Sequence, residues 1–145
     1  MKYNYSHIFS MGSNPVIAVD FDGTCVKHAY PEMGEDVPGA VQCLKRLVLN
    51  RAALILYTMR SGPELDAAVA WFESHSIRLW AVNTNPTQKR WTSSNKTYAE
   101  LYIDDAALGV PLVVDPTPGV RPWVDWYEVS RLLWPSSTLS DTPSS

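Results

Sequence analysis

Two aspartates separated by one phenylalanine stand directly after a short apolar run near the beginning of the chain. The run spans residues 16–19, and Asp20, Asp22, Gly23 and Thr24 belong to the loop that follows it. In such a loop one carboxylate can act as a nucleophile, and a second can donate and accept the proton that the reaction moves. The alternative is a solvated turn with two incidental acids, which the apolar run and the glycine turn disfavour.

A second acidic feature, Asp104 and Asp105, follows the apolar run at 98–103. Together with Asp20, this pair would supply the oxygen ligands that a small hard cation such as Mg²⁺ prefers. We expect Asp105 to bind the metal directly, and Asp104 to act through water or Lys96. The alternative interpretation is an acid-rich helix N-terminus, which leaves the position after a strand unexplained.

A threonine and two lysines lie between these acidic features. Thr58 closes the apolar run at 52–57, and a threonine in that position is more often only a helix cap or turn residue. Lys96 precedes Asp104 by eight positions, and Lys89 is its rival as a basic site residue. The alternative for either lysine is a solvated surface position.

Apolar periodicity predicts the elements that must position these residues. We expect strands at 16–19, 52–57, 78–82, 98–103 and 111–114, and helices at 38–50, 63–74 and 123–134. The segment 83–95, rich in Asn, Thr, Ser and Pro, is expected to be a loop. Alternation of strands and helices predicts a three-layer Rossmann-like α/β fold with a central parallel sheet, where ligands bind at the carboxyl ends of the strands.

Length and composition indicate one globular unit. The chain has 145 residues, of which 46% are hydrophobic and 19% charged, and its formal net charge is -3. We expect a domain at 16–135 between an N-terminal extension at 1–15 and a flexible tail at 136–145, with the residues before Asn14 also mobile. The net charge gives no general attraction to nucleic acid or anionic lipid. Without an apolar leader or membrane-spanning run, the expected location is the cytoplasm.

The acidic and hydroxyl residues, with Lys96, fall in the order of the four motifs of the haloacid dehalogenase (HAD) superfamily. The resemblance runs from about Val16 to Gly109. It implies that Asp20 attacks phosphorus to form an aspartyl phosphate, that Asp22 is the acid and base, and that Thr58 binds a phosphoryl oxygen. Lys96 would neutralise the phosphate and restrain the charge of the nucleophile.

The same resemblance assigns a metal site and a substrate site. Mg²⁺ would be held by Asp20, Asp22, Asp104 and Asp105. Substrate would be bound by Gly23, Thr24, Met59 and Arg60. Within the superfamily, the segments 28–34 and 58–60 also resemble a small group of viral and bacterial phosphatase-like proteins.

The identity of the second acid and the short spacings narrow the expected activity. Members with an aspartate at the position of Asp22 transfer phosphate to water, whereas the dehalogenases lack it and the ion-pumping ATPases carry a threonine. The residues between the motifs leave no room for a full cap domain. Segment 25–37 is expected to be either a small flap, with His28, Tyr30 and Glu32 facing the substrate, or an ordinary connecting hairpin.

The expected activity is therefore Mg²⁺-dependent hydrolysis of a phosphomonoester, with a phosphorylated small molecule or a nucleotide as substrate. A nucleic-acid end stays open, because Arg60, Lys89, Arg90 and Trp91 could form a local patch, with Trp91 either stacking on a base or anchoring its loop. Two other activities are alternatives: a binding or regulatory module with weak catalysis, and a phosphomutase. A homo-oligomer, whose second subunit could serve as the missing cap, is also open.

Overall fold

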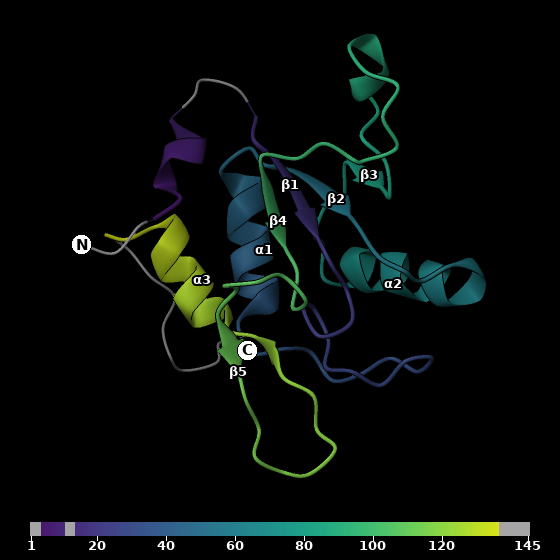
Figure 1. The fold of residues 1–145 in the computed structure, drawn as a ribbon, viewed down its shortest axis with the longest axis vertical. Coiled ribbons are helices and arrows are strands. Elements are labelled where there is room, and N and C mark those ends of the chain that lie inside the picture. The colour runs from purple at the N-terminus through teal and green to yellow at the C-terminus, as the bar shows by residue number, and fades with distance from the viewer. Residues whose placement is uncertain (1–3, 11–13, 137–145) are drawn as a thin grey trace.

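The centre of the molecule is a four-stranded parallel sheet (Figure 1). The computed structural model describes residues 4–10 and 14–136. The strand order is β3-β2-β1-β4, and the strands are β1 (Val16–Val19), β2 (Ala53–Leu56), β3 (Ala81–Val82) and β4 (Leu101–Ile103). Residues 17–19 of β1 and 54–56 of β2 are buried, so the two central strands are covered on both faces as is typical of parallel strands, whereas the edge strands β3 and β4 are less buried. The expected α/β class with a parallel sheet and no cap is confirmed.

Three helices accompany the sheet: α1 (Ala40–Leu49), α2 (Gly62–Ser74) and α3 (Trp126–Leu133). Helix α1 buries Ala40, Cys43, Leu44 and Leu47, which recur at helical spacing and form one apolar face. This face joins the main core, which also contains Ile17, Val19, Leu54 and Leu56 of the two central strands, and the buried residues of α2 and α3.

The opposite face of the sheet carries smaller residues and a thinner cover. Ala18 and Ile55, which alternate with the main-core residues of their strands, form a second cluster with Ala99. Ala99 belongs to the connection between β3 and β4, which contains the short 3₁₀ helix η2 (Gln88–Arg90) and no α-helix. The connection is therefore largely the loop that its polar composition predicted.

The segment after β4 differs from the expected pattern. The strands β5 (Leu112–Val113) and β6 (Trp123–Val124) pair with each other antiparallel and form a separate two-stranded sheet. The last helix accordingly begins at Trp126 and not at Trp123. Its start is set by Asp125, whose side chain accepts a hydrogen bond from the backbone N–H of Glu128 at 3.1 Å.

The head of the chain also differs from expectation, because residues 5–9 pack on α3. The 3₁₀ helix η1 (Ser6–Phe9) buries Ile8, and the ring of Phe9 stacks on Trp134 at a centroid distance of 5.5 Å. The backbone N–H of Tyr5 donates to the carbonyl of Leu132 at 2.7 Å. These contacts order a segment that was expected to be mobile.

The expected flexible tail lies, from residue 137 onward, outside the described residues. Among the described helices, none has both the length and the apolar character needed to cross a membrane.

Candidate metal centre

The loop after β1 is held beside the end of β4. The backbone N–H of Asp20 donates to the carbonyl of Ile103 at 3.0 Å, which continues the pairing of Val19 with Ile103. Thr24, which is fully buried, donates from its hydroxyl to Oδ2 of Asp20 at 3.1 Å and accepts from the backbone N–H of Asp105 at 3.2 Å. Thr24 therefore holds the carboxyl group of Asp20 and the backbone of Asp105, and its contact with substrate stays a prediction.

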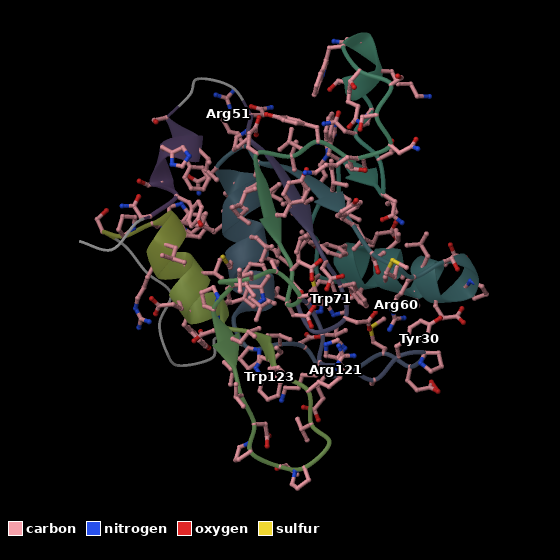
Figure 2. The ribbon with its side chains drawn as sticks, viewed as in Figure 1. Tyr30, Arg51, Arg60, Trp71, Arg121 and Trp123 are labelled. Atoms are coloured by element: carbon pink, nitrogen blue, oxygen red, sulfur yellow. The ribbon has the colours of Figure 1, made fainter. Side chains whose placement is uncertain are left out.

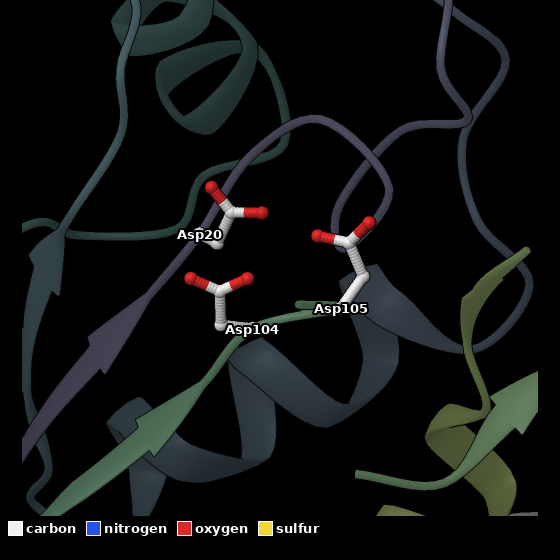
Figure 3. Close-up of side chains that lie close together, drawn as sticks. All are labelled: Asp20, Asp104 and Asp105. Carbon is white, nitrogen blue, oxygen red and sulfur yellow. The ribbon is translucent and has the colours of Figure 1, made fainter. Parts of the chain in front are cut away.

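Three carboxyl groups converge at this end of the sheet (Figure 3). Asp20, Asp104 and Asp105 each place one oxygen within 4.8 Å of the others. They meet because β1 and β4 are parallel neighbours whose carboxyl ends lie at one edge. Three of the four expected metal ligands are thus brought together, and Asp22 does not belong to the group.

The shared environment of these acids disfavours negative charge. Burial, the hydrogen bond with Asp105 and the charge of Asp104 together raise the pKa of Asp20 to about 8. Burial, followed by the nearby Asp105, also raises the pKa of Asp104. A bound divalent cation would replace the protons that this cluster otherwise holds. The all-oxygen donor set and the excess negative charge fit Mg²⁺.

Asp22 faces away from that cluster and pairs with Arg60. Nε of Arg60 donates to Oδ2 of Asp22 at 2.8 Å, and Nη2 donates to Oδ1 at 2.7 Å, a bidentate pair. Arg60 is 3% exposed, and its guanidinium lies 5.0 Å from the ring centroid of Phe21 and 5.3 Å from that of Tyr30. The hydrogen bond to Asp22 raises the pKa of Arg60. Figure 2 shows Arg60 beside Tyr30 near the first turn of α2. Arg60, expected to bind substrate, therefore has an internal partner.

Thr58 and Met59 lie in the turn between β2 and α2. The hydroxyl of Thr58 accepts a hydrogen bond from the backbone N–H of Arg60 at 3.1 Å. This contact is typical of a turn residue, which was the alternative role considered for Thr58. Within the described residues the hydroxyl donates to no acceptor, and its binding of a phosphoryl oxygen stays a prediction. The backbone N–H of Thr58 donates to Oδ1 of Asn83 at 2.8 Å, so the end of β3 fixes this turn. Met59 is 97% exposed.

Lys96 lies on the exposed side of the loop before β4. Its Nζ is 5.8 Å from the ring centroid of Tyr102, a residue that shares the strand face of Asp104 by alternation. Within the ranges 4–10 and 14–136, neither Lys96 nor Lys89 forms a salt bridge with a carboxylate. The buried Gln88 donates to the carbonyl of Lys96 at 2.7 Å and so fixes the backbone beneath this lysine. The contact with Tyr102 favours Lys96 over Lys89, and its role stays a prediction.

Segment 25–37 is a hairpin that also reaches the site. Val26 and Asp36 pair antiparallel, and the backbone N–H of Lys27 donates to the carbonyl of Glu35 at 2.8 Å. From this hairpin, Nε2 of His28 lies 2.7 Å from Oδ2 of Asp105. The carbonyl of Glu32 accepts from Nη2 of Arg60 at 2.8 Å. The segment is therefore a connecting hairpin that contacts Asp105 and Arg60, and the expectation that its side chains face a substrate stays a prediction.

The contact of His28 with Asp105 was not foreseen from the sequence. The two residues are 77 positions apart, and no spacing rule joins them. The nearest signal is Gly23, which adopts a left-handed φ of +82° where the chain passes this contact. The structure places Gly23 where His28 and Asp105 approach each other, and the expectation that Gly23 binds substrate stays a prediction.

The fold and the acidic cluster define the class: a parallel α/β protein with a candidate divalent-metal centre at the carboxyl ends of β1 and β4. No protein-family model and no curated protein matches the chain. A solved structure described as that of a conserved protein coded by a locus from Bacteroides thetaiotaomicron is 40% identical, with a TM-score of 0.61. The match covers 67% of this chain and 80% of that chain. The chain belongs to the same family as this conserved Bacteroides protein.

Proposed function

We propose that the protein is a Mg²⁺-dependent phosphatase of the HAD superfamily that hydrolyses a phosphomonoester through an aspartyl phosphate. The observation that carries this proposal is the convergence of Asp20, Asp104 and Asp105 at neighbouring strand ends. These are the residues that the motif order assigns to the nucleophile and the metal site. When bound, Mg²⁺ would neutralise charge on the acids and on the transferring phosphoryl group.

In the first step the carboxylate of Asp20 attacks phosphorus. A bond forms between an Asp20 oxygen and phosphorus while the bond from phosphorus to the ester oxygen breaks, and the alcohol leaves after gaining a proton. Thr24 supports this geometry because it holds Oδ2 of Asp20 at 3.1 Å and thereby limits rotation of the carboxyl group. Thr58 and Lys96 are proposed to bind the phosphoryl oxygens.

In the second step water attacks phosphorus, the bond to Asp20 breaks, and inorganic phosphate leaves. We assign the acid and base role to Asp22. Because both of its oxygens accept hydrogen bonds from Arg60, Asp22 is arranged as an acceptor. Each Asp22 oxygen keeps a lone pair that Arg60 does not use, so the carboxyl group can hold the proton that it takes from water or gives to the leaving oxygen without separating from Arg60.

The substrate class is proposed from the open site. The described part of the chain forms no cap domain over the acids, so a phosphorylated small molecule or a nucleotide can approach, and a nucleic-acid end stays within the proposal. Trp91 is 63% exposed, and its ring packs edge-on against Tyr98 at 5.4 Å, which is the contact of a loop anchor. A second copy of the chain completing the site also stays a proposal.

The test is hydrolysis of p-nitrophenyl phosphate, nucleotides, sugar phosphates and 3′-phosphorylated oligonucleotides with and without Mg²⁺. We expect Mg²⁺-dependent release of phosphate by the wild type and none by Asp20→Asn. Asp66→Asn, at an exposed position of α2, is the matched control and should retain full activity. Equal rates for the wild type and Asp20→Asn would refute the mechanism. Failure of every ester would favour the binding module, and transfer of phosphate to a sugar hydroxyl would favour the phosphomutase.

A further inference from the structure

We propose that His28 is a positioning residue for the metal ligand Asp105, which it holds with one carboxyl oxygen so that the group faces Asp20 and Asp104. The inference rests on the proposed function and deepens it, because it assigns a role to the hairpin that the motifs do not include. His28 is not itself a member of the three-carboxylate group, so it acts through Asp105.

The contact is short and shielded from water. Nε2 of His28 lies 2.7 Å from Oδ2 of Asp105, and the two side chains are only 15% and 12% exposed. A hydrogen bond in such surroundings meets little competition from solvent and restricts the carboxyl group more than an exposed one would. The backbone N–H of Asp105 is held separately by Thr24, so the residue is fixed at two points.

The chain leaves space for this contact at Gly23. A Cβ atom at Gly23 would lie 2.1 Å from Nε2 of His28 and 2.3 Å from Oδ2 of Asp105, the same two atoms that meet. Its φ of +82° is also a conformation that side-chain-bearing residues rarely adopt. The nucleophile loop therefore passes against the contact closely enough that only glycine fits.

His28 is presented by a hairpin that is anchored elsewhere. Asp36, at the base of the hairpin, accepts from Nε1 of Trp71 at 2.7 Å and lies 3.2 Å from Nε2 of His75, both residues at the C-terminal part of α2 and its end. Near the tip, the carbonyl of Glu32 is bound by Arg60. His28 thus stands on a segment fixed on both sides, which lowers the entropy lost when Asp105 is ordered for a cation.

Hydrogen-bond partners of metal ligands orient those ligands, and their removal typically weakens metal binding by roughly 10- to 100-fold. We expect this range for His28→Phe, which keeps a planar ring and removes both nitrogens. His28→Gln places an amide near the position of Nε2 and should recover most of the affinity.

The experiment is a calorimetric titration of Mg²⁺ into the wild type, His28→Phe, His28→Gln and His7→Gln, with thermal melts of each protein. His7→Gln is the matched control, because His7 is an exposed histidine of η1 and takes no part in the hairpin or the metal centre. The expected result is a Kd raised roughly 10- to 100-fold in His28→Phe, near wild type in His28→Gln, and unchanged in the control. The rise in Tm that Mg²⁺ produces should shrink in the same order.

Equal Mg²⁺ affinity in the wild type and His28→Phe would overturn the inference, and so would a loss in His28→Gln as large as in His28→Phe. If His28→Phe does not fold, His28→Ala takes its place, and a Kd for Mg²⁺ equal to that of the wild type and of His7→Gln overturns the inference. Weakened Mg²⁺ binding in His28→Phe without hydrolysis of any ester by the wild type would support the inference and refute the proposed function. No Mg²⁺ binding by the wild type would overturn both.

Discussion

The two aspartates of the nucleophile loop stand two positions apart and have opposite surroundings. Asp20 lies among the acids Asp104 and Asp105, and its pKa is raised to about 8. Asp22 receives two hydrogen bonds from the buried guanidinium of Arg60. Within residues 4–10 and 14–136 the first acid forms no ion pair with a basic side chain and can recruit a cation from solution, whereas the second is paired with the guanidinium of Arg60. When two carboxylates have environments that differ in this way, one loop can provide two chemical roles.

The largest expected effect is a loss of catalytic activity, and its size differs between the two acids. We expect Asp20→Asn to lower kcat for phosphate esters by roughly 10³-fold or more, because the covalent step loses its nucleophile. Asp22→Asn should lower kcat by roughly 10²- to 10³-fold, the range of lost acid and base catalysis. Steady-state kinetics with Mg²⁺ in excess measures both. A smaller loss in Asp20→Asn than in Asp22→Asn would reverse the assigned roles.

The next largest effect is on the free energy of unfolding, and it concerns Arg60, which pairs with Asp22. We expect Arg60→Met to lower the free energy of unfolding by about 3 kcal/mol, because Asp22 would lose its partner and the carbonyl of Glu32 would lose a donor. Urea denaturation measures the change, and Arg78→Met, at an exposed position, is the control. In the double variant with Asp22→Asn, part of the loss should be recovered. Strict additivity of the two single changes would argue against a coupled pair.

A third effect follows from the raised pKa of Asp20. Between its ordinary value of 3.8 and about 8, the folded protein holds a proton on Asp20 that the unfolded chain releases. Metal-free protein should therefore lose stability as pH rises through this window, by roughly 1 to 3 kcal/mol when relaxation of the acids and access of water are allowed for. Denaturation at pH 5 and pH 8 measures it. Asp20→Asn should flatten the dependence, and Mg²⁺ should stabilise more at pH 8 than at pH 5. A rise in metal-free stability toward pH 8 would contradict the prediction.

The smallest effect is expected at Met59. Its side chain is 97% exposed, so Met59→Ala should change the free energy of unfolding by less than about 0.5 kcal/mol. If Met59 contacts substrate as the motif suggests, KM should rise while kcat is unchanged. Unchanged KM for every hydrolysed ester would remove Met59 from the substrate site.

Local patterns were sufficient to predict the sheet and the acids at its edge. The run at 16–19 became β1 with the same bounds, and Asp20, Asp104 and Asp105 followed parallel strands into one cluster. Apolar periodicity predicts such elements because burial of one face is a local property. It could not show that β5 leaves the parallel sheet, since strand pairing depends on distant partners. The cap at Asp125 was visible in the sequence and would have moved the start of the last helix to Trp126.

Side-chain partners were less predictable than backbone elements. Arg60 follows Thr58 in a motif that suggested substrate, and only the folded chain brings its guanidinium to Asp22, 38 positions away. The contact of a His28 nitrogen with Asp105, 77 positions away, was likewise not predicted from the sequence. Both pairs join segments whose separation along the chain carries no periodic signal. They depend on how the hairpin at 25–37 packs, which the sequence left open.

The attachment of the hairpin tip to Arg60 has an evolutionary consequence. Arg60 binds the backbone carbonyl of Glu32, a group that every amino acid supplies, so the tip stays in place whatever side chain occupies position 32. The neighbouring side chains of Tyr30 and Met33 are 60% and 41% exposed. The side chains of Glu32 and Met33 are therefore free to differ between relatives without loosening the acids, and under the proposed function this short segment is where substrate preference would change.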